Sequence, residues 1–166
     1  MQVSYRKKLH AITTFVFDFD GVLSDGKIYT LPDGDMIRAT HVKDGHAIHQ
    51  ALNKGYRIAI ITGGYSETIP ARFRNFGQID VFMKVVDKAP VFNQYLAQYN
   101  IAPEEVLFMG DDIPDLPLMH LAGVACCPAD AAIEIKAVAD YISFKNGGDG
   151  CVRDVIEQTL RIHENW

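Results

Sequence analysis

Several acidic, hydroxyl and amino side chains of this sequence follow short apolar runs. In chain order they are Asp18, Asp20, Thr62, Lys88, Asp111, Asp112 and Asp115. If they lie together, so many carboxylates repel one another unless a cation shares the site, and an all-oxygen set suits Mg²⁺. Phosphoryl transfer fits this set. One carboxylate can attack phosphorus and a second can protonate the leaving oxygen, while Mg²⁺ and an ammonium group offset the charge.

The apolar runs predict the strands that would bring these side chains together. The expected strands are 12–17, 57–61, 81–83, 106–109 and 124–126, and helix-like segments lie between them at 45–53, 67–76, 88–99, 116–121 and 131–139. Strands that alternate with helices form a parallel sheet with helices on both faces. Such sheets bind ligands beyond the carboxyl ends of their strands. The expected fold class is therefore α/β, a doubly wound parallel sheet.

One segment after the first strand interrupts this alternation. Residues 27–30 and 36–40 are strand-like and flank an Asp33-Gly34 turn, which predicts a β-hairpin insertion. The length of 166 residues and the ordinary composition indicate one domain with its own core. We expect that domain to span 1–166, with an N-terminal extension at 1–10 and, at 147–166, a Gly-rich hinge and a C-terminal helix.

Charge and cysteine content exclude several other classes of protein. The net charge is -5 and basic residues do not gather beyond a short N-terminal group, so nucleic acid is not an expected partner. No apolar window is long enough to span a membrane, and the start has no apolar signal region. Cys126, Cys127 and Cys151 have no metal-binding spacing, and we expect them to be reduced in a cytoplasmic protein.

The strand-end segments together resemble the motifs of the haloacid dehalogenase superfamily of phosphatases. Asp18-Phe19-Asp20-Gly21 resembles its first motif, Thr62 its second, Lys88 its third, and Gly110-Asp111-Asp112 with Asp115 its fourth. The order and spacing of all four match, which makes the resemblance specific.

The resemblance implies a role for each acidic residue. Asp18 is expected to be the nucleophile and Asp20 the general acid and then the general base. Thr62 and Lys88 complete the expected catalytic set. Mg²⁺ is expected to bind Asp18, the backbone carbonyl of Asp20, and Asp111, while Asp112 and Asp115 support the metal and Lys88 from behind.

The spacing of the motifs predicts a member without a cap domain. The hairpin, one helix and one strand fill the segment between Asp20 and Thr62, and one helix and one strand fill the segment between Thr62 and Lys88. A site without a cap is open. Loops or another subunit must therefore hold the substrate and exclude water.

Longer strings resemble the 3-deoxy-D-manno-octulosonate 8-phosphate phosphatases and their nonulosonate 9-phosphate relatives. The strings are residues 21–26, 42–45, 61–63, 86–88 and 147–150 with Arg153. The resemblance implies hydrolysis of the octulosonate phosphate in lipopolysaccharide precursor biosynthesis. It also implies a homotetramer in which a neighbouring subunit closes the site. The substrate-binding residues expected on this basis are Asp20, His41, Val42, Lys43, Asp44, Gly45, His49, Gly63, Gly64, Arg72 and Lys88.

Alternatives remain open at this point. A nonulosonate 9-phosphate would need the same catalytic residues, although relatives acting on it can carry Glu where this chain has Gly64. A non-enzymatic phospho-acceptor, or a scaffold without activity, would share the fold. Receiver domains place their acidic pair before the acceptor Asp, the reverse of the order here, and they have no use for Asp20. A zinc site at His41, His46 and His49 is a further alternative.

Overall fold

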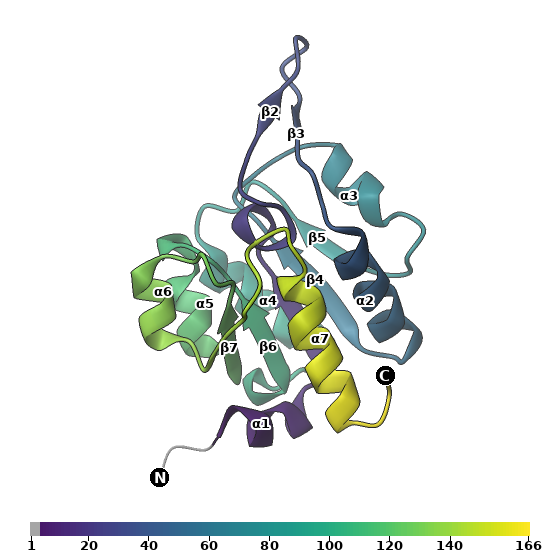
Figure 1. Cartoon of the computed structure of the whole chain (residues 1–166), viewed down its shortest axis with the longest axis vertical. Helices are drawn as coiled ribbons and strands as arrows, with labels where there is room; N and C mark the ends of the chain where they lie inside the picture. Colours follow the sequence, from purple (N-terminus) through teal and green to yellow (C-terminus); the bar gives the residue numbers. More distant parts are fainter. Residues whose placement is uncertain (1–3) are drawn as a thin grey trace.

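A computed structural model describes residues 4–166 of the chain (Figure 1). Its core is a six-stranded sheet in the order β5-β4-β1-β6-β7-β8, in which every pair of neighbours is parallel. The strands are β1 (Thr14–Phe17), β4 (Arg57–Ile61), β5 (Asp80–Phe82), β6 (Val106–Met109), β7 (Val124–Cys127) and β8 (Tyr141–Ile142). The predicted doubly wound parallel sheet is confirmed.

Helices cover both faces of this sheet (Figure 1). On one face lie α2 (Val42–Asn53), α3 (Thr68–Phe73) and α7 (Cys151–Ile162), and on the other lie α4 (Lys88–Tyr99), α5 (Leu116–Leu121) and α6 (Ile133–Val138). Helix α2 begins before the predicted start because the His41 side chain caps it: Nδ1 accepts a hydrogen bond from the Lys43 amide at 3.2 Å.

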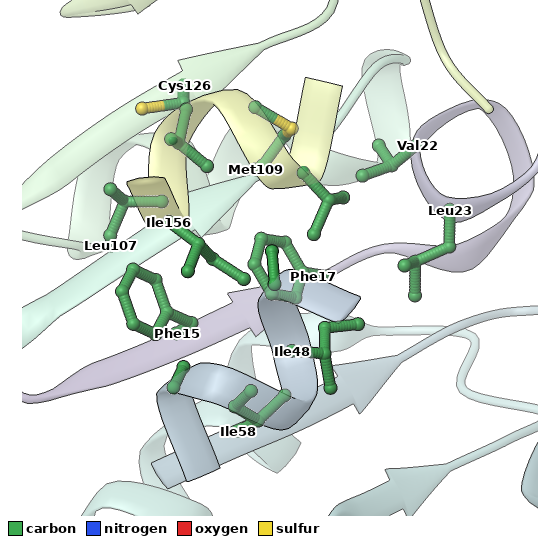
Figure 2. Close-up of a cluster of buried hydrophobic side chains, with 14 of the residues drawn as sticks. Phe15, Phe17, Val22, Leu23, Ile48, Ile58, Leu107, Met109, Cys126 and Ile156 are labelled. Carbon is green, nitrogen blue, oxygen red and sulfur yellow. The ribbon is translucent and has the colours of Figure 1, made fainter. Parts of the chain in front are cut away.

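The central strand β1 is buried on both faces, as its continuous apolar run predicts. Phe15 and Phe17 point to the face covered by α2 and α7, and their rings stack with centroids 6.1 Å apart. Figure 2 shows Phe17 of β1 together with Ile48 of α2 and Ile156 of α7. Val16 points to the opposite face, toward α4 and α5. The two cores hold the carboxyl end of β1 in place.

The predicted hairpin is present as the antiparallel pair β2 (Tyr29–Thr30) and β3 (Met36–Ile37). It projects beyond the sheet (Figure 1). Within residues 4–166 the segments between the strand ends hold only this hairpin and single helices, so no cap domain is inserted there. The two-residue strand β8 was not predicted, because its apolar run is too short to be recognised in the sequence.

Two short helical segments precede the first strand of the sheet. Residues 1–3 of the expected N-terminal extension lie outside the described residues, while α1 (Tyr5–Lys8) and a short 3₁₀ turn, Leu9–Ala11, precede the sheet.

The three cysteines are free and buried. None of the helices in residues 4–166 has the length and apolar character needed to cross a membrane.

Candidate active site

Asp18, the first carboxylate of the predicted catalytic set, lies at the end of β1. The backbone amide of Asp18 donates to the Met109 carbonyl of β6 at 3.0 Å, which extends the strand pairing to the site itself. Lys88, the first residue of α4, places its Nζ 2.8 Å from Asp18 Oδ1 and 2.6 Å from Asp115 Oδ1. All three residues are buried. One ammonium group therefore bridges two carboxylates that come from different strand ends.

Asp115 also organises the loop after β6. Its Oδ2 accepts hydrogen bonds from the amides of Asp111 and Asp112, at 3.0 and 3.4 Å. The exposed Asp112 instead caps the following turn, where Oδ1 accepts from the Ile113 amide at 2.8 Å. Both oxygens of Asp115 are thus engaged by the protein. These contacts agree with the expectation that Asp115 holds Lys88 and the loop that carries Asp111.

Thr62 lies at the end of β4 with its hydroxyl group fixed. The Thr62 amide donates to the Phe82 carbonyl of β5 at 2.9 Å, and Oγ1 accepts from the Gly64 amide at 3.1 Å. The residue is buried, yet it lines the same cavity as Asp18 and Lys88. Its hydroxyl hydrogen is free to point toward a phosphoryl oxygen in that cavity.

Burial and mutual repulsion control protonation in this cluster. Burial, with the nearby carboxylate of Asp115, raises the pKa of Asp18 to about 6 even though Lys88 opposes the shift. Burial and the charges of Asp18, Asp115 and Asp112 raise the pKa of Asp111 to about 8. Burial alone would lower the pKa of Lys88, but the two adjacent carboxylates raise it overall. Lys88 is therefore charged, and the cluster still lacks positive charge.

The donor set fits a hard divalent cation. Carboxylate oxygens of Asp18, Asp111 and Asp115 lie within 4.8 Å of one another, and no other such group of acidic, His or Cys ligands occurs in residues 4–166. They face a cavity of about 390 Å³ at the carboxyl ends of the strands. Because the three carboxylates have only the Lys88 ammonium group beside them, and all donors are oxygens, Mg²⁺ suits this cluster.

Asp20 lies in the same cavity and has a partner that the sequence did not reveal. Arg38 donates from Nε to Asp20 Oδ1 at 2.8 Å and from Nη2 to Oδ2 at 3.0 Å. The arginine follows β3 by one residue, so the hairpin brings it to the site. Nothing in the local sequence marks Arg38, because the pairing depends on how the hairpin folds back.

All but one of the residues expected to bind substrate line one of three cavities. Asp20, Gly63, Gly64 and Lys88 line the strand-end cavity with Asp18. Val42, Gly45, His49 and Arg72 line a second cavity of about 430 Å³, and His41 and Lys43 line a third of about 640 Å³ beside α7. The structure thus places the first group with Asp18 and the other two groups in cavities of their own.

Asp44 lines none of these cavities. It is 1% exposed, and its Oδ1 accepts from the Arg153 amide at 2.7 Å in the first turn of α7. Because Gly150 has no side chain to cap α7, Asp44 caps that helix from α2. Burial raises the pKa of Asp44. This position supports a structural link between the loop at 41–45 and the Gly-rich segment before α7.

Gly45 makes room for Arg72. A Cβ at position 45 would lie 2.4 Å from Arg72 Nη2. The guanidinium group also donates to Thr40 Oγ1 at 2.9 Å and lies 4.9 Å from the centre of the Phe76 ring. A side chain at position 45 would displace Arg72, so these two predicted substrate residues depend on each other.

Comparison with known proteins identifies the family of this chain. The family model of the haloacid dehalogenase-like hydrolases matches residues 65–155. The chain belongs to that family. It is 36% identical over 153 residues to the 3-deoxy-D-manno-octulosonate 8-phosphate phosphatase of Salmonella typhi, covering 92% of this chain and 81% of that protein.

Solved structures agree over nearly the whole chain. The phosphatase of the same name from Moraxella catarrhalis, crystallised with magnesium, phosphate and KDO, superposes with a TM-score of 0.93 at 32% identity, covering 97% of this chain and 92% of that one. The cobalt-bound enzyme from Haemophilus influenzae gives a TM-score of 0.90 at 28% identity, covering 95% and 92%. The expected superfamily and its fold are therefore confirmed.

Proposed function

We propose that this protein is a Mg²⁺-dependent phosphatase that hydrolyses 3-deoxy-D-manno-octulosonate 8-phosphate to the free sugar acid and phosphate. The reaction type rests on one observation: two carboxylates of the same loop, those of Asp18 and Asp20, line one cavity. Asp18 is also paired with Lys88. The substrate rests on the named relatives, which match this chain over more than nine tenths of its length.

The first step transfers the phosphoryl group to Asp18. An oxygen of Asp18 bonds to phosphorus as the ester oxygen leaves, and Asp20 gives that oxygen its proton. Lys88 holds Asp18 in place and offsets negative charge. The Thr62 hydroxyl and the amides of Gly63 and Gly64 would bind the phosphoryl oxygens.

The second step releases phosphate. Water attacks phosphorus, the Asp18–phosphorus bond breaks, and the Asp20 carboxylate takes a proton from the water. Asp18, Asp111 and the backbone carbonyl of Asp20 would hold Mg²⁺, whose charge offsets that of the phosphoryl oxygens in both steps. Asp115 and Asp112 would hold the loop that carries Asp111.

We propose further that residues 1–166 form one phosphatase domain that works as a homotetramer in the cytoplasm, in lipopolysaccharide precursor biosynthesis. Exposed apolar side chains on and beside the hairpin support an assembly surface: Ile28, Tyr29 and Leu31 are 45, 57 and 37% exposed. A neighbouring subunit seated there would cover the open catalytic cavity. It would also supply walls to the cavities that hold the loop at 41–45 and Arg72.

Phosphate release from octulosonate 8-phosphate and from a nonulosonate 9-phosphate, with and without Mg²⁺, tests the proposed function. Asp18→Asn serves as the blank. A preference of tenfold or more in kcat/KM for the octulosonate, about 1.4 kcal/mol of transition-state binding, supports it. The reverse preference would assign the nonulosonate. If neither sugar phosphate releases phosphate, the proposed substrate is wrong. If no phosphate ester is hydrolysed in the presence of Mg²⁺, the phosphatase function is wrong, and the phospho-acceptor and scaffold alternatives are favoured.

A further inference from the structure

The ion pair between Arg38 and Asp20 joins the hairpin to the acid–base group. Two N–H groups of the guanidinium meet the two carboxylate oxygens, which is the bidentate geometry that gives the strongest and most directional pairing. The Arg38 side chain is only 2% exposed, whereas that of Asp20 is 26% exposed. The arginine therefore lies behind the carboxylate, and the carboxylate faces the cavity.

Arg38 is itself fixed by two backbone carbonyl groups. Its Nη1 donates to the Met36 carbonyl, at the start of β3, and to the Tyr65 carbonyl at 3.4 Å, in the loop after β4. All three nitrogens of the guanidinium group are thus engaged. A side chain held at so many points has little freedom, and it transfers that constraint to Asp20.

Two neighbours complete the setting of the Asp20 carboxylate. Ser24 Oγ donates to Oδ1 at 3.3 Å. On the other side, a Cβ at position 64 would lie 2.9 Å from both Asp20 Oδ2 and Arg38 Nη2, so Gly64 leaves the space that the ion pair occupies. The position of the carboxylate is therefore set by contacts from three separate loops.

We propose that Arg38 is a positioning residue for Asp20, and this inference rests on the phosphatase function proposed above. A general acid must lie within hydrogen-bond reach of the leaving oxygen, and a misplacement of about 1 Å can cost roughly 10²-fold in rate. Arg38 holds the carboxylate beside Asp18 after its proton has gone to the leaving oxygen. The same placement readies it to take the proton of the attacking water.

The shape of the guanidinium explains why an arginine stands here. A lysine would keep the positive charge but offers a point contact instead of a planar fork, so it would leave one carboxylate oxygen free to turn. Substitution by Met removes both the charge and the fork. The two variants therefore separate orientation from charge.

The test compares Arg38→Met, Arg38→Lys and the control Arg74→Met with the full-length wild-type protein in Mg²⁺. Arg74 is exposed, just after α3, and serves as a matched loss of one arginine. Three esters are used: octulosonate 8-phosphate, phenyl phosphate and 4-nitrophenyl phosphate. The sugar alkoxide and phenoxide released from the first two esters are poor leaving groups that need a proton. The 4-nitrophenolate released from the third leaves without one.

We expect Arg38→Met to lower kcat on the sugar phosphate and on phenyl phosphate by about 30-fold, part of the 10²–10⁴-fold that general acid–base catalysis supplies. KM should change by less than about threefold. With 4-nitrophenyl phosphate the first turnover should remain fast and give a burst, because only the second step still needs Asp20. Arg38→Lys should recover part of the loss, and Arg74→Met should stay within about twofold of wild type on all three esters.

Other outcomes would overturn the positioning role. An equal loss on phenyl and 4-nitrophenyl phosphate, without a burst, would mean that Arg38 merely supports the fold. Unchanged kcat in Arg38→Met would remove the residue from the mechanism. If Arg38→Met does not fold, Arg38→Lys, which retains the positive charge, is compared with wild type on the same three esters. If wild type hydrolyses the aryl esters but not the sugar, the proposed substrate fails while the aryl comparison still decides the role of Arg38.

Discussion

Removal of the Lys88 ammonium group tests the electrostatic design of the site. Lys88 is 5% exposed and is the cation shared by Asp18 and Asp115, which are 10 and 1% exposed at the side chain. Substitution by Met keeps most of the volume and leaves both carboxylates buried without their counter-ion. Removing one partner of a buried ion pair costs about 3–5 kcal/mol.

The expected loss depends on pH. The pKa of Asp18 is already raised to about 6 with Lys88 in place, and the loss of Lys88 raises it further. A carboxyl group whose pKa is higher in the folded than in the unfolded protein binds a proton on folding, so stability falls as pH rises between the two values. The destabilisation of Lys88→Met should therefore be near its full size at about pH 8, and smaller at about pH 5.5, where Asp18 can take up a proton.

Thermal unfolding followed by circular dichroism measures this effect. For a chain of this length about 1 kcal/mol corresponds to roughly 2–4 °C, so Lys88→Met should lower Tm by roughly 6–20 °C at about pH 8. Saturating Mg²⁺ should recover part of that loss, because it supplies the missing positive charge. Lys54→Met is the matched control, since Lys54 is exposed at the end of α2. A loss below about 1 kcal/mol at both pH values would refute the view that Lys88 balances the buried carboxylates.

Three other perturbations address single residues of the site. Asp20→Asn should let the phosphoryl group accumulate on Asp18 when 4-nitrophenyl phosphate is the substrate, which intact-mass analysis after an acid quench detects; turnover at the wild-type rate would contradict the acid–base role. Asp44→Ala should destabilise the protein by about 1–2 kcal/mol through the lost cap of α7, whereas Asp44→Asn should be nearly neutral in urea unfolding and leave KM unchanged; a raised KM in the Asn variant would instead favour substrate contact. Because the pKa of Asp111 is raised to about 8, stability of the metal-free protein should fall as pH rises from about 4 to about 8. Mg²⁺ competes with that proton, so it should raise Tm more at about pH 8 than at about pH 6, and an equal rise at both would exclude Asp111 as the group that titrates.

The fold and the catalytic cluster follow from patterns that the sequence displays locally. A parallel strand buried on both faces must be a short apolar run, and the carboxyl ends of neighbouring strands must meet at one edge. Asp18 and Thr62 directly follow such a run, Asp111 follows one after a single glycine, and Lys88 opens the next helix. Their convergence could therefore be predicted without knowing a single side-chain contact.

Features that depend on long-range packing could not be predicted in this way. The capping of α7 by Asp44 joins residues far apart in the chain through a buried carboxylate, and a buried acid has no distinctive sequence pattern. The pairing of Arg38 with Asp20 depends on the angle at which the hairpin returns to the sheet. The division of the expected substrate residues among three cavities likewise depends on loop shapes that spacing does not determine.

The distribution of ion pairs in the site explains why a metal ion would bind beside Asp111. Asp18 and Asp115 share Lys88, and Asp20 is paired with Arg38. Asp111 accepts no hydrogen bond or ion pair at its carboxylate from residues 4–166, and its pKa is raised to about 8. Two cations of the protein thus face the four carboxylates of Asp18, Asp20, Asp111 and Asp115, which leaves two negative charges uncompensated when all four are ionised. A divalent cation bound at Asp111 would balance those two charges while both ion pairs persist, so the proposed Mg²⁺ site and the placement of Asp18 and Asp20 have the same electrostatic origin.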